Sequence, residues 1–186
     1  MDVRPPVPVL LVAAVFSRHA DALSWTQARL EESYGPVEQS SPAFTFHQTD
    51  YYAALMGTDL RKQFLVFRDL IDPGRLAEIK LHTNALEREL AESGRFHEER
   101  PVNIDPGYLT LGKFLLATTK DQGHRVYLRD GVFAEVTLRF QAGAYEPWPW
   151  TYSDYREPAL RDFLRDARAL YHDRLRAARP QPPAVP

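Results

Sequence analysis

Strict alternation of apolar and polar residues predicts two β-strands between residues 126 and 138. The apolar positions are Val126, Leu128, Val132, Ala134, Val136 and Leu138. Arg129-Asp130-Gly131 interrupts the alternation, and a three-residue loop with Gly131 in the left-handed conformation would pair Leu128 with Val132. A two-residue Asp-Gly turn would instead pair Arg129 with Val132 and mix the two faces. The pattern therefore predicts a hairpin with the longer loop and one apolar face.

The polar face of this hairpin places Arg125 opposite Glu135 and Tyr127 opposite Phe133. Opposite charges that face each other across antiparallel strands contribute roughly 0.2 to 1 kcal/mol. One interpretation of Arg125 and Glu135 is therefore a simple cross-strand ion pair. The other is that both belong to a ligand site, and the residues before the hairpin favour this second interpretation.

Two polar segments precede the hairpin. Residues 103–108 form a turn by composition, because Pro106 restrains its own backbone and Gly107 permits a positive φ. Residues 118–125 form a second polar turn. Between them, residues 109–117 are apolar enough for a buried strand or a short helix. Two turns at opposite ends of one strand would lie apart, unless the chain kinks near Gly112 or breaks after Pro106.

The remaining apolar patterns predict three further strands and three helices. The predicted strands are residues 7–16, 44–47 and 64–67, and the predicted helices are residues 21–34, a segment that begins at Asp72-Pro73, and residues 157–175. The segment with Asp50, Tyr51 and Tyr52 is predicted to be a loop. Strand, helix, strand, strand, helix, strand is the order of a ferredoxin-like unit. We therefore expect an α+β, ferredoxin-like two-layer sandwich whose mostly antiparallel sheet is extended by the hairpin.

The second helix carries a buried stripe at helical spacing and a polar row beside it. The stripe is Leu76, Ile79, Thr83, Leu86 and Leu90, and the row is Lys80, Asn84 and Glu87. Such a row is usually solvated, so its contribution to a site is the less common alternative. Residues 146–152 hold two tryptophans between prolines. They would form a loop that covers the core or, less commonly, a stacking platform for a base or a sugar.

Two short motifs carry a resemblance to a known family: N-I-D-P-G-Y at residues 103–108 and T-K-D-x-x-H-R at residues 119–125. In these motifs the chain resembles the bacterial domain-of-unknown-function 4416 family, and the resemblance extends over nearly the whole sequence. It includes Met56-Gly57, Ile79-Lys80, Thr83-Asn84, Glu87, Glu135-Val136-Thr137 and Trp150-Thr151-Tyr152, with Ser153 where a proline is expected before Asp154. Members of this family are uncharacterised, although some carry a loose GTP-binding label.

The familiar catalytic templates are missing from the sequence. It has no G-x-x-x-x-G-K-[ST] phosphate loop to support the GTP label, no G-x-S-x-G elbow and no H-E-x-x-H zinc motif. His47-Gln48-Thr49 supplies one H-x-[ST] motif, whereas a two-histidine phosphoesterase needs two. With no cysteine, the chain also lacks a thiol nucleophile and a thiolate metal site.

Length and charge limit the number of domains and the classes of partner that the chain suits. The 186 residues suit one domain, predicted as residues 1–178, with a disordered proline-rich tail at residues 179–186. A net charge of −2 gives no electrostatic reason to expect a nucleic-acid or membrane partner. The apolar segment near the start, residues 7–16, is too short to span a bilayer and has a poor leader for a signal sequence. We expect a cytoplasmic protein whose oligomeric state the sequence does not specify.

What remains is a set of polar residues that offers acids, a base and cations. The predicted catalytic residues are Asp105, His124 and Glu135, and the predicted ligand-binding residues are Lys80, Asn84, Asn103, Lys120, Arg125 and Tyr152. Such a mixture suits a small phosphorylated or carboxylated molecule, bound on the polar face of residues 102–140. No resident metal is predicted, but Asp105, His124 and Glu135 would suit Mg²⁺ or Mn²⁺ better than structural zinc. The competing hypothesis is a non-catalytic interaction or scaffold domain, in which the same side chains only pin turns.

Overall fold

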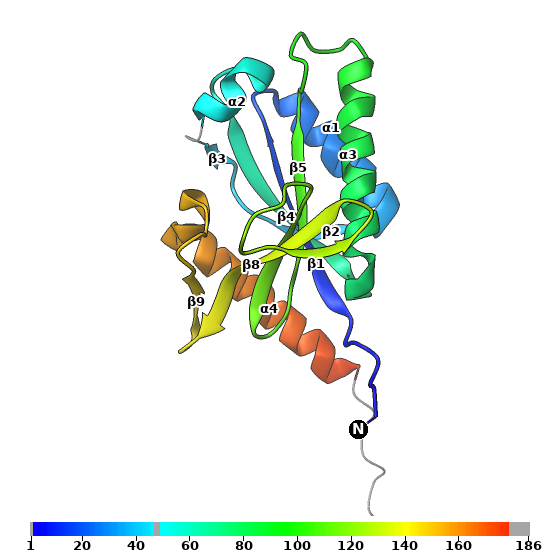
Figure 1. Ribbon diagram of the computed structural model, residues 1–186, viewed down its shortest axis with the longest axis vertical. Helices are drawn as coiled ribbons and strands as arrows, with labels where there is room; N and C mark the ends of the chain where they lie inside the picture. The colour runs from blue at the N-terminus through cyan, green and yellow to red at the C-terminus, as the bar shows by residue number, and fades with distance from the viewer. Residues whose placement is uncertain (1, 47–48, 179–186) are drawn as a thin grey trace, which may run out of the picture.

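The computed structural model of the protein describes residues 2–46 and 49–178 (Figure 1). The strands are β1 (Val9–Ser17), β2 (Val37–Ser40), β3 (Phe44–Thr45), β4 (Arg61–Ile71), β5 (Asn103–Leu109), β6 (Lys113–Thr118), β7 (Val126–Arg129), β8 (Val132–Gln141) and β9 (Ala144–Pro147). The helices are α1 (Ala20–Tyr34), α2 (Thr49–Met56), α3 (Leu76–Glu92) and α4 (Pro158–Ala177), with short 3₁₀ helices η1 (Pro73–Arg75) and η2 (Ser153–Arg156). The predicted tail, and His47 and Gln48 of the H-x-[ST] motif, lie outside the described residues.

The strands form one antiparallel sheet, which confirms the predicted α+β class. The strand order is β2-β4-β1-β5-β6-β8-β7, with β3 paired to β4 and β9 paired to β8. The described ranges contain four α-helices rather than about three, because the polar and aromatic segment predicted to be a loop forms α2. None of the helices in these ranges has the length and apolar character needed to cross a membrane.

Helices cover both faces of the sheet, so the core has two layers, one on each face, and the predicted two-layer sandwich of one sheet and one helical layer is wrong. Side chains at alternate positions of β1 point to opposite faces, because the side-chain period of a strand is two. Leu11 and Val15 pack with α1 and α3 on one face, whereas Leu10 and Val12 pack with α4 on the other. In Figure 1, α1 and α3 lie together along one side and α4 crosses the opposite side. A smaller cluster around Phe16 packs α2 beside the end of β1.

The predicted helix boundaries hold for α1, α3 and α4. Gly35 ends α1 with a positive φ of 84°, which residues with a side chain rarely adopt. Asp72 caps the turn that leads into α3, since its carboxylate accepts a hydrogen bond of 2.7 Å from the Gly74 N–H. The predicted stripe of α3 is buried, but Lys80 and Glu87 are buried as well, and this rules out a solvated polar row.

The segment between the two motifs is a hairpin and not a single strand. Residues 103–108 were predicted as a turn, yet they form most of β5, and residues 109–117 contain a tight connection to β6. Pro106 is tolerated within β5 because β6 pairs with the last three residues of that strand, from Gly107 onward. The antiparallel return brings the end of β6, and the polar residues 118–125, back beside Asn103 and Asp105.

Gly107 marks the point where β6 crosses closest to β5. A Cβ atom at this position would lie 2.0 Å from the main-chain oxygen of Leu115, so no side chain fits there. The glycine of the N-I-D-P-G-Y motif is therefore required by the close approach of two backbones and not by a turn.

The β7–β8 hairpin differs from its predicted register at one position. Val126 pairs with Ala134 and Tyr127 with Phe133, as predicted, but Arg129 rather than Leu128 pairs with Val132. Asp130 and Gly131 both have positive φ, the signature of a two-residue Asp-Gly turn. An irregularity between Tyr127 and Arg129 absorbs the extra residue, so the short turn does not mix the faces as expected.

The apolar alternation does not form one continuous buried face. A register shift in the β6–β8 pairing near Thr137 turns the two halves of β8 to opposite sides. Val132 and Ala134 therefore pack against α3, whereas Leu138 packs in the α4 layer. Val126 and Leu128 remain exposed, because β7 is the outermost strand and is open on both faces.

Replacing Gly107 tests the close crossing of β5 and β6. Gly107→Ala should lower the free energy of unfolding by about 2 kcal/mol, since the new Cβ overlaps a main-chain oxygen that cannot move alone. Thermal denaturation should then show a Tm about 4–8 °C lower. Gly112→Ala is the matched control, because a Cβ there meets no atom within 4 Å. Equal Tm values for both variants would contradict the crossing.

Candidate functional site

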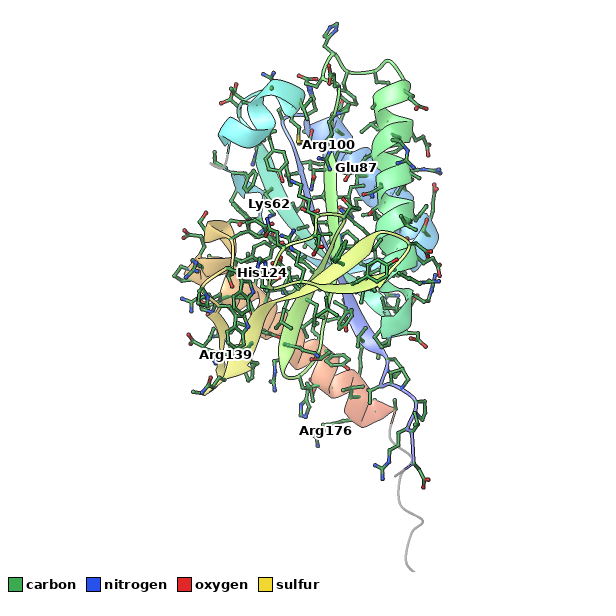
Figure 2. All side chains as sticks on the ribbon, viewed as in Figure 1. Lys62, Glu87, Arg100, His124, Arg139 and Arg176 are labelled. Atoms are coloured by element: carbon green, nitrogen blue, oxygen red, sulfur yellow. The ribbon has the colours of Figure 1, made fainter. Side chains whose placement is uncertain are left out.

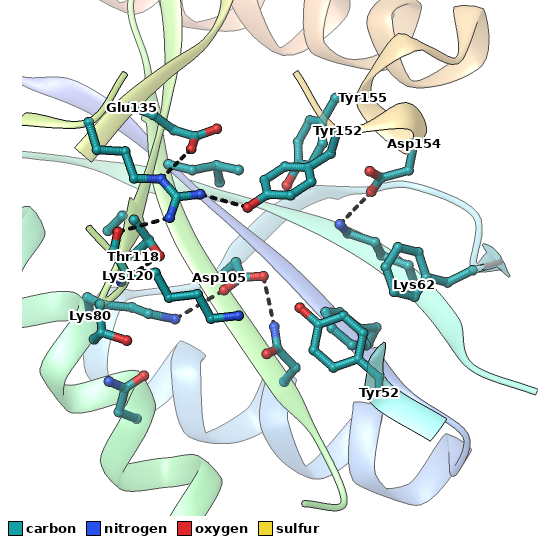
Figure 3. Close-up of a pocket in the computed structure, with 18 of the residues that line it drawn as sticks. Tyr52, Lys62, Lys80, Asp105, Thr118, Lys120, Glu135, Tyr152, Asp154 and Tyr155 are labelled. Carbon is teal, nitrogen blue, oxygen red and sulfur yellow. Dashed lines mark hydrogen bonds and ion pairs between the residues drawn. The ribbon is translucent and has the colours of Figure 1, made fainter. Parts of the chain in front are cut away.

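A cavity of about 130 Å³ opens where β6 separates from β5, on the face of the sheet that α2 and α4 flank (Figure 3). Its polar lining residues are Tyr52, Lys62, Lys80, Asn84, Arg100, Asn103, Asp105, Thr118, Thr119, Lys120, Arg125, Glu135, Tyr152, Asp154 and Tyr155. Phe16, Phe46, Leu116 and Ala117 complete the wall. These residues come from both layers of the fold and from strands far apart in the sequence.

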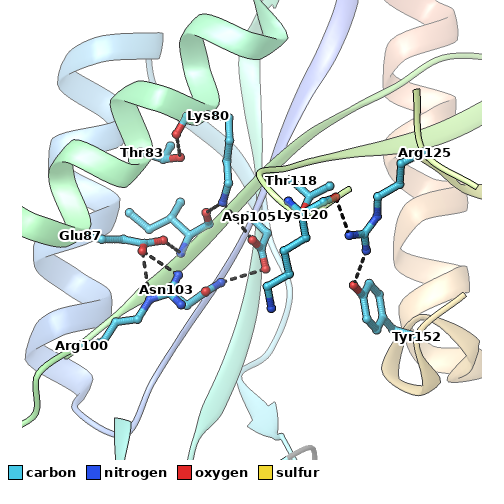
Figure 4. Close-up of polar contacts among 11 residues, drawn as sticks. Lys80, Thr83, Glu87, Arg100, Asn103, Asp105, Thr118, Lys120, Arg125 and Tyr152 are labelled. Carbon is cyan, nitrogen blue, oxygen red and sulfur yellow. Dashed lines mark hydrogen bonds and ion pairs between the residues drawn. The ribbon is translucent and has the colours of Figure 1, made fainter. Parts of the chain in front are cut away.

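Asp105, a residue of β5, lines the cavity where Lys80 of α3 reaches that strand. Lys80 donates hydrogen bonds to its Oδ1 at 3.1 Å and to the Ile104 carbonyl at 2.8 Å, while Asn103 donates to its Oδ2 at 2.8 Å (Figure 4). Burial by itself would raise the pKa of Asp105, but the ammonium groups of Lys80 and Lys62 outweigh it and hold this pKa below its ordinary value. Asp105 is therefore a carboxylate at neutral pH, with both oxygens held in place.

Arg125 joins three segments on the other side of the cavity. Its guanidinium donates to Glu135 at 2.8 Å, to the Lys120 carbonyl at 2.9 Å and to the Tyr152 hydroxyl at 2.7 Å. The two charged side chains are almost completely buried, with exposed fractions of 1% and 2%. The predicted cross-strand pair is thus present, but it is a buried junction and not a surface contact. Burial also raises the pKa of Tyr152, which keeps the hydroxyl protonated.

A third ion pair closes the cavity at the end of α3. Arg100 donates two hydrogen bonds to one carboxylate oxygen of Glu87, at 3.0 and 2.7 Å, and the Ile104 N–H donates to the other at 2.7 Å. Burial raises the pKa of Glu87 despite the nearby Lys80 and Arg100. The pair fixes the start of β5 against α3.

Lys62 is the main residue of the cavity that the sequence analysis missed. Its ammonium lies 2.6 Å from Asp154 of η2 and 4.6–5.6 Å from the ring centroids of four aromatic residues. These rings belong to Phe16, Phe46, Phe64 and Tyr155. The rings stabilise the buried cation. One signal was available: Lys62 shares the buried face of β4 with Phe64 and Val66, where an apolar residue is expected.

The lining of the cavity carries more cationic than anionic side chains, together with two buried oxygens that lack a hydrogen-bond partner among the described residues. The described lining has five cationic side chains against three carboxylates. The cations are Lys62, Lys80, Arg100, Lys120 and Arg125, and the carboxylates are Asp105, Glu135 and Asp154. Two buried oxygens, Asp154 Oδ1 and the Tyr155 hydroxyl, have no hydrogen-bond partner among the described residues. Buried polar atoms of this kind need a partner, so the lining can accept further donors as well as an anion.

His124 lies behind Glu135 and does not line the cavity. Its Nε2 is 3.2 Å from Glu135, and its ring stacks on Trp150 at 5.3 Å. Trp150 in turn stacks on Trp148 at 5.2 Å, and the guanidinium of Arg139 lies 4.5 Å from the Trp148 ring. His124 and Arg139 are labelled on one side of the molecule in Figure 2. The tryptophan segment therefore stacks on the protein's own side chains.

Eight of the nine predicted site residues line this one cavity, and His124 contacts the cavity through Glu135. Asn84 and Lys120 reach it from α3 and from the loop after β6. Within residues 2–46 and 49–178, no group of three or more His, Asp or Glu side chains could hold a metal ion. Asp105, His124 and Glu135 thus do not come together as a metal site.

Comparison with known proteins gives one match. The family model described as domain of unknown function (DUF4416) matches residues 7–171. Searches of curated proteins and of solved structures found no match.

Removing Arg125 tests the junction. Arg125→Met leaves Glu135 buried without its main partner and should destabilise the fold by about 3–5 kcal/mol, measured by chemical denaturation. Adding Glu135→Gln should recover part of this loss, because the buried charge is then gone. Arg129→Met is the control. Arg129 and Asp130 form a long ion pair of 3.9 Å and both side chains are exposed, so the loss of this pair should cost little stability. A loss for Arg125→Met no larger than for the control would contradict a buried junction.

Asp105 should contribute to the acid stability of the fold. Because its pKa is lower in the folded protein than its ordinary 3.8, its contribution is present above this value and is lost as the pH falls through the folded pKa. In Asp105→Asn, Tm should therefore fall less steeply than in the wild type below about pH 4. Asp121→Asn, at an exposed position, should keep the wild-type slope. Identical slopes for all three proteins would refute a lowered pKa.

Proposed function

Since the chain belongs to the DUF4416 family, whose description states no activity, we propose its function from the cavity itself. The proposal is that the cavity binds the anionic group of a small phosphorylated or carboxylated molecule. The observation that carries it is the convergence of five cationic side chains, from α3, β4 and the loops around β5–β7, on one space of about 130 Å³. Charged donors of this kind bind carboxylate and phosphate oxygens strongly.

Two side chains are the proposed primary contacts of the anion. Lys120 belongs to the loop after β6, and its side chain lines the cavity from an exposed position. Asn84 adds an amide at the same wall. Lys80 and Arg125 lie deeper and provide positive potential while they hold Asp105 and Glu135. This division assigns binding to the rim and positioning to the buried pairs.

If the protein is an enzyme, Asp105 is the proposed proton-transfer group. Its carboxylate lines the cavity and is ionised at neutral pH, as a general base must be. His124 is better suited to orient Glu135, because its Nε2 faces that carboxylate. The GTP label finds little support, since the chain has no phosphate loop and the cavity is too small for a complete nucleotide.

The topology of the first part of the sheet is the subject of a second proposal. We propose that β1, α1, β2, β4, α3 and β5 form a ferredoxin-like unit. Its support is the spatial order β2-β4-β1-β5, with each neighbouring pair antiparallel. The remaining strands would then be an extension of this unit.

One observation favours the alternative of a non-catalytic scaffold. The lining cations form ion pairs with carboxylates of the same chain, such as Lys62 with Asp154, Lys80 with Asp105, Arg100 with Glu87, and Arg125 with Glu135. In a scaffold these pairs would simply join segments of the fold. The two hypotheses differ in whether the cavity binds an added anion.

A thermal-shift screen separates them. The panel contains inorganic phosphate, sugar phosphates, dicarboxylates, ATP and GTP, each with and without Mg²⁺. A ligand at about a hundred times its Kd stabilises the fold by about 2.7 kcal/mol, equivalent to a Tm increase of about 5–11 °C. Lys120→Ala should lower the affinity by about tenfold or more, because it removes a charged donor from the anion.

Lys113→Ala is the matched control. Lys113 is an exposed lysine at the opposite end of β6 and does not line the cavity, so its loss should leave binding unchanged. No shift with any compound would support the scaffold. A shift that both variants retain would place the anion elsewhere on the protein.

A further inference from the structure

The cavity is too small to enclose a whole ligand. Its volume of about 130 Å³ compares with about 300–1,000 Å³ for typical small-molecule sites, and each water molecule occupies about 30 Å³. It can therefore take a phosphate or carboxylate group but not the rest of the molecule. A ligand bound as proposed above must extend into a neighbouring space.

A second cavity, of about 550 Å³, lies between β3, η2 and α4. Its wall is mainly apolar and is formed by Pro42, Phe44, Phe46, Ala159, Leu160 and Phe163, with Ser41, Thr45, Ser153, Asp154 and Glu157 among them. The volume is within the range of sites that enclose a ligand, and apolar walls of this kind bind apolar groups.

Two residues line both cavities, Phe46 and Asp154. The Oδ2 atom of Asp154 accepts a hydrogen bond from Lys62, so the carboxylate at this boundary is neutralised. Its side chain is only 8% exposed, and its Oδ1 atom has no hydrogen-bond partner in the part of the chain that the structure describes. A buried carboxylate oxygen without a partner requires a hydrogen-bond donor. A ligand that passes between the cavities would provide one.

A third space, of about 370 Å³, also adjoins the anion cavity and shares Asn84, Arg100 and Thr119 with it. This space is polar: its wall carries two carboxylates, Glu87 and Glu99, and two guanidinium groups, Arg88 and Arg100. Covering these charged groups with an uncharged part of a ligand would cost free energy of desolvation. The apolar cavity is larger and lies next to the unpartnered oxygen, so it is the better continuation.

Resting on the function proposed above, we infer that the ligand is amphipathic, with an anionic head, a hydrogen-bond donor beside it and an apolar tail. The head occupies the cationic cavity, the donor meets Asp154 Oδ1, and the tail lies between β3 and α4. N-acyl amino acids have these three parts in this order: a carboxylate, an amide N–H and an acyl chain. They are the ligand class that the two cavities fit.

A series of N-acylglycines tests the inference by calorimetric titration of the full chain. Acetyl-, hexanoyl- and decanoylglycine share the head and the N–H and differ in the tail, and all are used below their micelle concentrations. Affinity should rise by about fourfold for each methylene group that becomes buried. N-decanoylsarcosine, which lacks the N–H, should bind about tenfold or more weakly than decanoylglycine, because Asp154 Oδ1 then stays unpaired.

The variant Ala159→Phe tests whether the tail of the ligand occupies the apolar cavity. Ala159 is exposed on α4 and lines the apolar cavity, so a phenyl ring there should fill that cavity and leave the fold intact. The variant should bind acetylglycine like the wild type but lose the gain from longer chains. Ala169→Phe, at an exposed position of α4 outside the cavity, should keep the whole gain.

Each outcome distinguishes the inference from the function it rests on. Binding of acetylglycine and phosphate without any gain from longer tails overturns the inference and leaves the anion site intact. A gain that Ala159→Phe retains also overturns it, since the tail then lies elsewhere. Tighter binding of sugar phosphates than of every acylglycine assigns the extension to the polar space. If no member of the series and no phosphate binds, the anion site itself fails.

Discussion

The close crossing of two backbones at Gly107 is the constraint on which the arrangement of the site depends. Here the main chain of β6 approaches β5 too closely for any side chain, and on the N-terminal side of this point the two strands no longer pair. The resulting wedge in the sheet is filled by polar side chains from α3, η2 and the loop after β6. A continuous β5–β6 ladder would have covered Asp105 and left no space for a ligand. The cavity is therefore a consequence of strand geometry, and the side chains only line it.

Placing charged side chains in this wedge costs solvation free energy. Removing a charged group from water costs several kcal/mol, and an ion pair recovers this cost only with good geometry and additional hydrogen bonds. Lys80 and Arg125 meet that condition, because each donates further hydrogen bonds beside the one to its carboxylate partner. Lys62 pairs with Asp154 at 2.6 Å, but the other oxygen of that carboxylate has no partner among the described residues. Apolar residues in their place would often be at least as stable. Stability alone therefore does not account for so many buried charges around one space, and the anionic ligand proposed above would give them a role.

Sequence patterns predicted those parts of the protein in which local chemistry and tertiary structure agree. The end of α1 at Gly35 and the buried stripe of α3 depend on nearby residues, and the structure contains them as predicted. The predicted Asp72 cap is also present, but it caps η1, which leads into α3. The motif at residues 103–108 misled because Pro106 and Gly107 usually signal a turn, and no local rule reveals that another strand crosses there. The sequence identified the polar residues of the site by their types and their motifs. It did not show that they converge, because their convergence depends on the antiparallel return of the chain from β5 to β6. Lys62 was missed because a single lysine in an otherwise apolar strand is not by itself evidence of a site.

The stack formed by Arg139, Trp148, Trp150 and His124 gives the protein a pair of closely spaced indole chromophores. The two indoles are nearly parallel, with ring planes 5° apart, and they are two of the three tryptophans in the chain. Because the two ring centroids lie 5.2 Å apart, we expect the electronic transitions of the two indoles to couple and to contribute to the circular dichroism of the protein. His124 lies at the end of this stack and also contacts Glu135, which lines the cavity. The two stacked indoles are thus connected to the candidate site through His124 and Glu135.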